Sequence, residues 1–179
     1  SGLLQRVPRI TVEKAHRYPS AKQWEAADLV VFYLQMQPMK PSQFAMMDAF
    51  LQRGGGLVAI HGAFIQGPIG TEVAKRFGLA WKRGQTRWGV LPMPSSVEPG
   101  RVHGILEDFP DELALVDEHY WGLDGKTNEL NVLVTSQAGP QKGSKGPPKD
   151  NQLDGKKWPI FWTKEIGKGR VFGSIPGHN

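Results

Sequence analysis

The sequence predicts a single α/β domain whose sheet is mostly parallel and ends in a C-terminal hairpin. Residues 28–34 form a nearly continuous apolar run, which is typical of a parallel strand buried on both faces. An amphipathic helix pattern follows over residues 41–53, and a second buried strand pattern covers residues 57–60. Strand, helix and strand joined by glycine-rich connections are the unit from which open parallel sheets are built.

The other elements follow in chain order. Residues 9–13 alternate between polar and apolar side chains, which predicts a short strand before the buried run. The helix begins at Pro41, carries Phe44, Met47 and Leu51 at spacings of three and four, and ends before three consecutive glycines. The second half of the chain is richer in strand patterns, which cover residues 87–93, 113–118, 131–136, 159–165 and 170–175. Gly-Lys-Gly joins the last two of these strands as a hairpin.

The composition excludes several classes of protein. A length of 179 residues suits one domain, and no apolar run reaches the roughly 20 residues that a membrane helix needs. Without cysteine, the chain has no disulfide, thiolate metal ligand or thiol nucleophile. The net charge of +5 arises within residues 139–170, which hold eight basic and three acidic side chains. Because residues 139–157 are rich in Gly, Pro and Lys, we expect a solvated loop there, with a phosphate or polyanion contact as the alternative. We expect neither a nucleic-acid nor a membrane partner.

Two histidines follow the ends of predicted strands. His61 comes directly after the strand over residues 57–60, and His178 belongs to a Gly-His pair after the last strand. Ligands of open α/β sheets bind outside the carboxyl ends of the strands, so we expect both histidines at one rim. A capping or packing role is the alternative for each. His103, which precedes Gly-Ile, is a further polar candidate.

A third group of polar side chains lies in the run Asp117-Glu118-His119-Tyr120. Alternation along a strand places Glu118 and Tyr120 on one face. A carboxylate can abstract a proton while a phenol donates a hydrogen bond to a developing oxyanion, so these two residues are a candidate acid/base pair. A surface carboxylate followed by a core tyrosine is the alternative.

Imidazole and carboxylate groups also suit zinc, which makes His61, Glu118 and His178 candidate metal ligands. Their spacing matches no local ligand motif, such as two histidines four residues apart on a helix. Trp162 is a candidate for stacking against a sugar ring, although tryptophan is more often a core residue.

Taken together, three segments resemble the ThuA-like (trehalose-utilisation) family of the class I glutamine amidotransferase-like superfamily. They are GGGLVAIHGAF from residue 54, the stretch from His103 into DEHYW, and PIFWTKEIGKGRVFGSIPGHN from residue 159. The resemblance implies a three-layer, flavodoxin-like sandwich with a crevice at the strand ends. It also implies one domain over residues 1–179, with the family's first strand lying before residue 1. True amidotransferases carry a catalytic cysteine at or next to the position of His61, so glutamine hydrolysis through a thiolate is excluded.

The resemblance further implies a function in carbohydrate catabolism through 3-keto sugars of trehalose or related disaccharides. We expect isomerisation or elimination after proton abstraction next to a ketone. The expected catalytic residues are His61, Glu118, Tyr120 and His178, and the expected substrate-binding residues are Asp117, His103 and Trp162. A divalent metal is the cofactor to be tested, no flavin is expected, and the expected partner is a small sugar or keto sugar.

Two other functions stay open. The main alternative is a non-catalytic sugar-binding or interaction module of a larger protein, and a flavin-binding electron carrier ranks behind it. The sequence also leaves open a homo-oligomer and does not distinguish a cytoplasmic from a periplasmic location.

Overall fold

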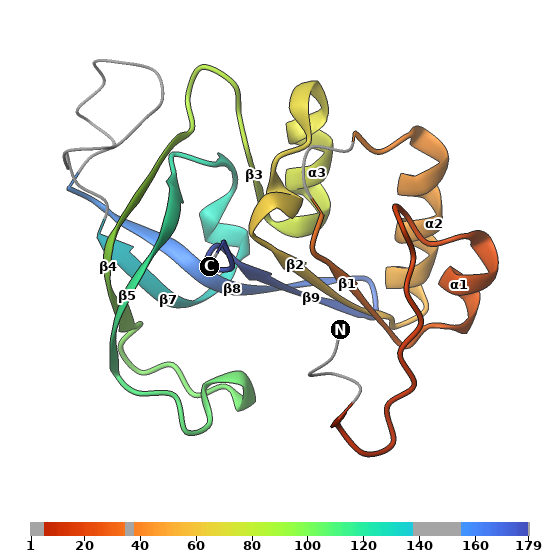
Figure 1. The fold of residues 1–179 in the computed structure, drawn as a ribbon, viewed down its shortest axis with the longest axis horizontal. Helices are drawn as coiled ribbons and strands as arrows, with labels where there is room; N and C mark the ends of the chain where they lie inside the picture. The colour runs from red at the N-terminus through yellow and green to blue at the C-terminus, as the bar shows by residue number, and fades with distance from the viewer. Residues whose placement is uncertain (1–5, 35–37, 138–154, 179) are drawn as a thin grey trace.

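The computed structural model describes residues 6–34, 38–137 and 155–178 and shows an α/β fold (Figure 1). Its centre is a seven-stranded sheet with the order β1-β2-β9-β8-β7-β4-β5. The strands of this sheet are β1 (Leu29–Phe32), β2 (Gly56–Ile60), β4 (Arg87–Val97), β5 (Glu112–Trp121), β7 (Asn131–Gln137), β8 (Lys157–Ile166) and β9 (Gly169–Ser174). Two short strands, β3 (Leu79–Ala80) and β6 (Asp124–Gly125), pair with each other.

The sheet is mixed, so the prediction of a mostly parallel sheet is wrong. Only the β1–β2 and β2–β9 pairs are parallel, whereas the pairs β9–β8, β8–β7, β7–β4 and β4–β5 are antiparallel. A parallel pair needs a long crossover, which a helix provides between β1 and β2. The strands from β7 onward have no described helix between them. The predicted hairpin is confirmed as β8 and β9.

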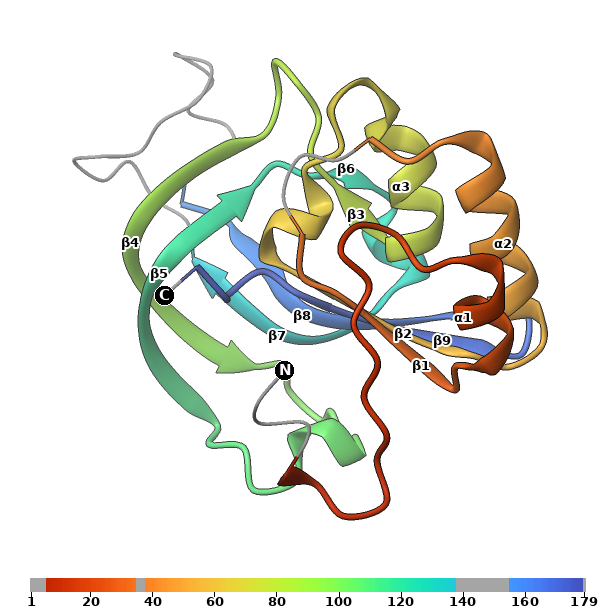
Figure 2. The same cartoon turned by 45° about the vertical axis from the view of Figure 1, so that its right-hand side comes forward.

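Three helices pack against one face of the parallel part of the sheet (Figures 1 and 2): α1 (Ala21–Ala26), α2 (Pro41–Gln52) and α3 (Gly70–Phe77). Phe32 of β1 lies at the centre of this packing, with its ring 6.0 Å from that of Trp24 in α1 and 5.7 Å from that of Phe77 in α3. Leu29 and Val31 point to the opposite face and are exposed. The helix predicted over residues 41–53 is confirmed as α2. The flavodoxin-like, three-layer arrangement stays a prediction.

The strand predicted over residues 9–13 is wrong. The backbone there is irregular, and Arg9 has a φ of 67°, a left-handed conformation that does not fit a strand. Ile10, the central apolar residue of the pattern, is 47% exposed, so the alternation has no buried face. The loop predicted over residues 139–157 lies outside the described residues up to residue 154.

The other predicted strands are all present, and β4 and β5 are longer than the sequence indicates. None of the described helices is both long and apolar enough to cross a membrane.

Candidate functional site

His61 lies at the carboxyl end of β2, where the chain turns sharply. It is the first residue of a 3-10 helix over His61–Phe64, and its φ of 48° is in the left-handed region. Such a backbone is uncommon for a residue with a Cβ and is found where the surrounding structure holds it. The ring is 6% exposed, and Nδ1 lies 2.9 Å from the carbonyl oxygen of Ile175. Because a carbonyl can only accept, Nδ1 donates this hydrogen bond, and Nε2 is the ring nitrogen that faces the other side chains of the site.

His178 follows β9 and is held there through its backbone. The Asp117 carboxylate accepts hydrogen bonds from the N–H groups of Gly177, at 2.8 Å, and His178, at 3.2 Å. On the other side of this turn, the Tyr33 hydroxyl donates to the carbonyl of Gly177 at 2.7 Å. Gly177 is needed at this position, because its φ is 144° and a Cβ would lie 2.6 Å from Ile60. The segment after β9 is therefore fixed against both β1 and β5.

Glu118 and Tyr120 come from β5, as the alternation predicts. The Tyr120 hydroxyl donates to Glu118 Oε2 at 2.7 Å and lies 2.7 Å from His61 Nε2. The Tyr120 ring stacks on the ring of His61 with centroids 4.7 Å apart. Burial, reinforced by the hydrogen bond to the Glu118 carboxylate, raises the pKa of Tyr120 far above its ordinary value. Tyr120 is thus a neutral hydrogen-bond donor at any physiological pH.

These side chains converge on one point although they come from three distant segments. His61 Nε2 lies 3.0 Å from Glu118 Oε2 and 3.2 Å from His178 Nδ1. His178 Nδ1 lies 3.5 Å from Glu118 Oε2. The cluster is open on the side of His178, whose side chain is 48% exposed, and enclosed on the side of Glu118, at 14%. The arrangement offers a carboxylate, two imidazoles and a phenol, which are the groups that proton transfer or metal binding requires.

A pocket of about 240 Å³ opens beside the cluster, lined by Tyr33, Leu34, His61, Gly62 and His178. The sequence analysis missed Tyr33. The signal was available, because Tyr33 lies near the carboxyl end of the first apolar run, at the same rim as the residues after β2 and β9. An apolar run predicts burial, however, and Tyr33 is 63% exposed.

Two of the expected substrate-binding residues lie elsewhere. His103 is in the connection between β4 and β5, where its Nδ1 accepts from the N–H of Ile105 and caps a short 3-10 helix. Trp162 is fully buried, and its Nε1 donates to the carbonyl of Phe77 at 2.8 Å. No face of the Trp162 ring is therefore open to a sugar. Asp117 is at the site, where it contacts the turn that carries His178.

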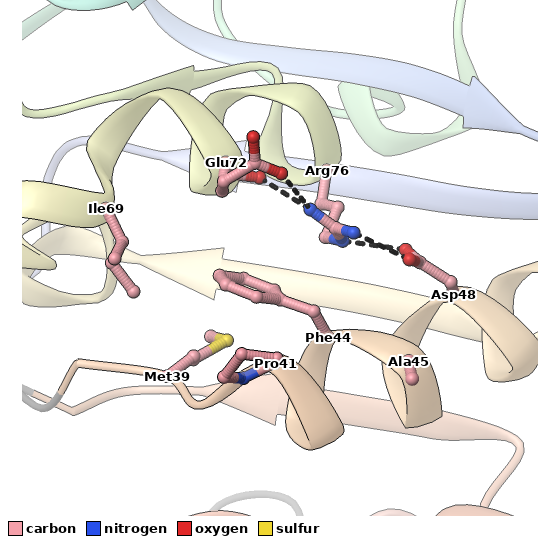
Figure 3. A pocket seen from close by; sticks show the side chains of 8 residues that line it. All are labelled: Met39, Pro41, Phe44, Ala45, Asp48, Ile69, Glu72 and Arg76. Carbon is pink, nitrogen blue, oxygen red and sulfur yellow. Dashed lines mark hydrogen bonds and ion pairs between the residues drawn. The ribbon is translucent and has the colours of Figure 1, made fainter.

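A second pocket, of about 410 Å³, lies between α2 and α3 (Figure 3). Its one cationic group, the guanidinium of Arg76, is bound to the Asp48 carboxylate at 2.7 and 2.6 Å and to Glu72 at 3.3 Å. The same group lies over the Phe44 ring, 4.3 Å from the centroid. Because these contacts explain the charged residues of this pocket, they support a structural role in joining the two helices.

Comparison with known proteins identifies the family. A model of the ThuA family, described as trehalose utilisation, matches residues 5–179. No curated protein sequence matches the chain. A ThuA-like protein of Parabacteroides merdae superposes with a TM-score of 0.67 at 19% identity, covering 87% of this chain and 61% of its own. A ThuA-like protein of Bacteroides uniformis gives 0.62 at 16%, covering 90% and 64%.

A β-galactosidase of Bacillus circulans contains a similar fold, with a TM-score of 0.50 at 12% identity over 82% of this chain and 19% of that enzyme. Identities this low establish the fold alone. The chain spans less than two thirds of the length of the two ThuA-like structures. The match of the family model covers nearly the whole chain, and the chain therefore belongs to the ThuA, or trehalose utilisation, family.

Proposed function

We propose that this chain provides the active site of an enzyme that isomerises a keto sugar by moving a proton next to the ketone. The observation that carries the proposal is the convergence of Glu118, His61, His178 and Tyr120 beside a pocket of about 240 Å³. Polar groups this close together are costly to bury unless they are paired or functional. A hydroxylated sugar ring is a ligand that such a rim of hydrogen-bonding groups suits.

Glu118 and Tyr120 have different roles in the proposed reaction. The Glu118 carboxylate takes the proton from the carbon that bears a hydroxyl next to the ketone, and the electron pair of that C–H bond forms the C=C bond of an enediolate. Tyr120, held neutral by burial, turns its single O–H from Glu118 to the oxygen that gains negative charge and donates a hydrogen bond to it. Glu118 then returns the proton to the former ketone carbon, while a hydroxyl proton passes between the two oxygens. No atom is gained or lost, and the ketone has moved by one carbon.

Hydrogen exchange with solvent tests this step without requiring the product to be known. In D₂O, a 3-keto disaccharide of the trehalose type should incorporate deuterium next to its ketone in the presence of the protein, as measured by NMR. Because general acid–base groups contribute about 10²- to 10⁴-fold, Glu118→Gln should slow exchange by at least about 100-fold with an unchanged circular dichroism spectrum.

A matched control is Glu112→Gln, which changes an exposed carboxylate on the same strand and should leave exchange unchanged. Equal exchange by the Glu118→Gln variant and the unmodified chain would overturn the proposed role of Glu118.

A non-catalytic sugar-binding module is the second candidate. It is favoured by the β-galactosidase of Bacillus circulans, in which a similar fold makes up 19% of a larger enzyme. Under this alternative, calorimetry would detect binding of a disaccharide, and no keto sugar would exchange hydrogen with solvent.

A further inference from the structure

We propose that His61 Nε2, Glu118 Oε2 and His178 Nδ1 bind one zinc-type divalent metal ion, with a further coordination position open to the neighbouring pocket. The inference rests on the proposed function and deepens it, because the metal would hold an oxygen of the sugar while the second oxygen of Glu118, Oε1, acts as the base. The sequence separates these ligands by 57 and 60 residues, so no local spacing reveals them. Their assignment rests on the geometry of the folded chain.

The three candidate ligand atoms have the spacing of one face of a coordination sphere. They form a triangle with sides of 3.0, 3.2 and 3.5 Å. A tetrahedral zinc ion with ligands at about 2.0–2.1 Å places neighbouring ligand atoms about 3.3–3.4 Å apart. The observed triangle therefore accommodates the ion with shifts of a few tenths of an ångström. Two histidines and one glutamate with an open position are also a known donor set of catalytic zinc.

The hydrogen bond of His61 fixes which of its ring nitrogens faces the other candidate ligands. Nδ1 donates to the carbonyl of Ile175, so Nε2 is the nitrogen that faces the carboxylate of Glu118. A hydrogen bond from the far nitrogen to a backbone carbonyl is also how proteins orient histidines that ligate metals.

The remaining ligands are held by contacts that leave their donor atoms directed at the same point. Tyr120 donates to Glu118 Oε2, which keeps a second lone pair for the metal, and Asp117 accepts from the backbone N–H of His178. His61 and His178 both line the pocket that Tyr33 borders, so the open position of the metal faces the space available to a ligand. Imidazole nitrogens argue against Mg²⁺ or Ca²⁺, which prefer oxygen ligands alone.

Metal binding to the chelator-stripped protein tests the assignment independently of turnover. We expect one equivalent of Co²⁺ to bind, with the intense visible absorption of a low-coordinate site, and Zn²⁺ to displace it, whereas Mg²⁺ does not compete. Glu118→Gln and His178→Asn should each lower Co²⁺ affinity by more than about 100-fold, beyond the effect of losing an outer hydrogen-bond partner. The control His16→Asn changes an exposed histidine outside the site and should retain one equivalent.

Three results would overturn the metal assignment: no Co²⁺ bound by the folded chain, binding of equal affinity in the two ligand variants, or a loss of binding equal to theirs in His16→Asn. The failure of the metal is distinguishable from the failure of the enzyme. If the stripped protein binds no Co²⁺ and still exchanges deuterium fully, the metal assignment is refuted and the proposed function is retained. If the protein binds one equivalent of Co²⁺ but catalyses no deuterium exchange, the metal site is retained and the proposed reaction is refuted.

Discussion

We expect His119 to make the stability of the protein sensitive to acid. It lies in β5 between two residues of the site, yet it is fully buried, and neither ring nitrogen has a hydrogen-bond partner within the described part of the chain. Its ring lies 5.6 Å from that of Trp121. Burial lowers the pKa of His119 from 6.5 to about 4, because the charged imidazolium would lose its hydration without gaining a partner.

The magnitude follows from the difference between the folded and unfolded states. At about 1.4 kcal/mol for each tenfold change in proton affinity, the lowered pKa of His119 corresponds to about 3 kcal/mol. The unfolded chain binds a proton at His119 more tightly than the folded chain, so the free energy of unfolding rises with pH between about 4 and 6.5. The contribution is fully present above pH 6.5 and is lost as the pH falls towards 4. Between pH 7 and pH 4.5 it amounts to about 2 kcal/mol.

Urea denaturation of the unmodified chain and of His119→Phe at both pH values measures this contribution. Because phenylalanine does not titrate, the free energy of unfolding of the variant should fall by about 2 kcal/mol less between pH 7 and pH 4.5 than that of the unmodified chain, whatever its value at pH 7. The matched control is His16→Phe, at an exposed position, which should keep the acid sensitivity of the unmodified chain. If His119→Phe and the unmodified chain lose the same free energy of unfolding on acidification, the reasoning is refuted.

Three further predictions concern residues around the site. Gly173→Ala should lower the free energy of unfolding by about 1–3 kcal/mol, because the new Cβ would lie 2.3 Å from the Trp162 ring, while Gly104→Ala, with open space around it, should change little in the same urea titration. Asp117→Asn should weaken Co²⁺ binding about 10- to 100-fold without abolishing it, since the turn carrying His178 loses its anionic acceptor; unchanged affinity would contradict that role. Tyr120→Phe should slow deuterium exchange about 10²- to 10³-fold in the NMR assay with the fold intact, and normal exchange would exclude Tyr120 as the oxyanion donor.

Much of the parallel part of the fold could be predicted from the sequence, because its signals are local. The apolar run over residues 28–34 and the pattern over residues 41–53 correspond to β1 and α2, since continuous or helically spaced apolar residues report burial directly. The alternation at residues 9–13 failed because Ile10, its central apolar residue, is 47% exposed and gives the segment no buried face. Sheet direction was wrong because a strand pattern carries no information about which strand will be its neighbour.

The candidate site was also predictable only in part. The positions of His61 and His178 after strands, and the shared face of Glu118 and Tyr120, brought the right residues to attention. Their distances depend on how far β5 curves towards the end of β9, which no local pattern encodes. The burial of Trp162 and the capping by His103 likewise depend on tertiary contacts.

The path of the chain through the site has a consequence for how the protein folds. β5 is an edge strand of the seven-stranded sheet, four strands beyond β9, and it reaches the turn after β9 only because β4 and β5 curve (Figure 2). Contacts between residues 59 and 117 positions apart therefore close only after the intervening strands have paired. Contacts so distant in sequence form slowly, since loop closure must precede them. A ligand that bridges His61, Glu118 and His178 would bind only after the sheet is complete. It would therefore raise the free energy of unfolding of the whole chain, and a tighter-binding ligand would raise it more.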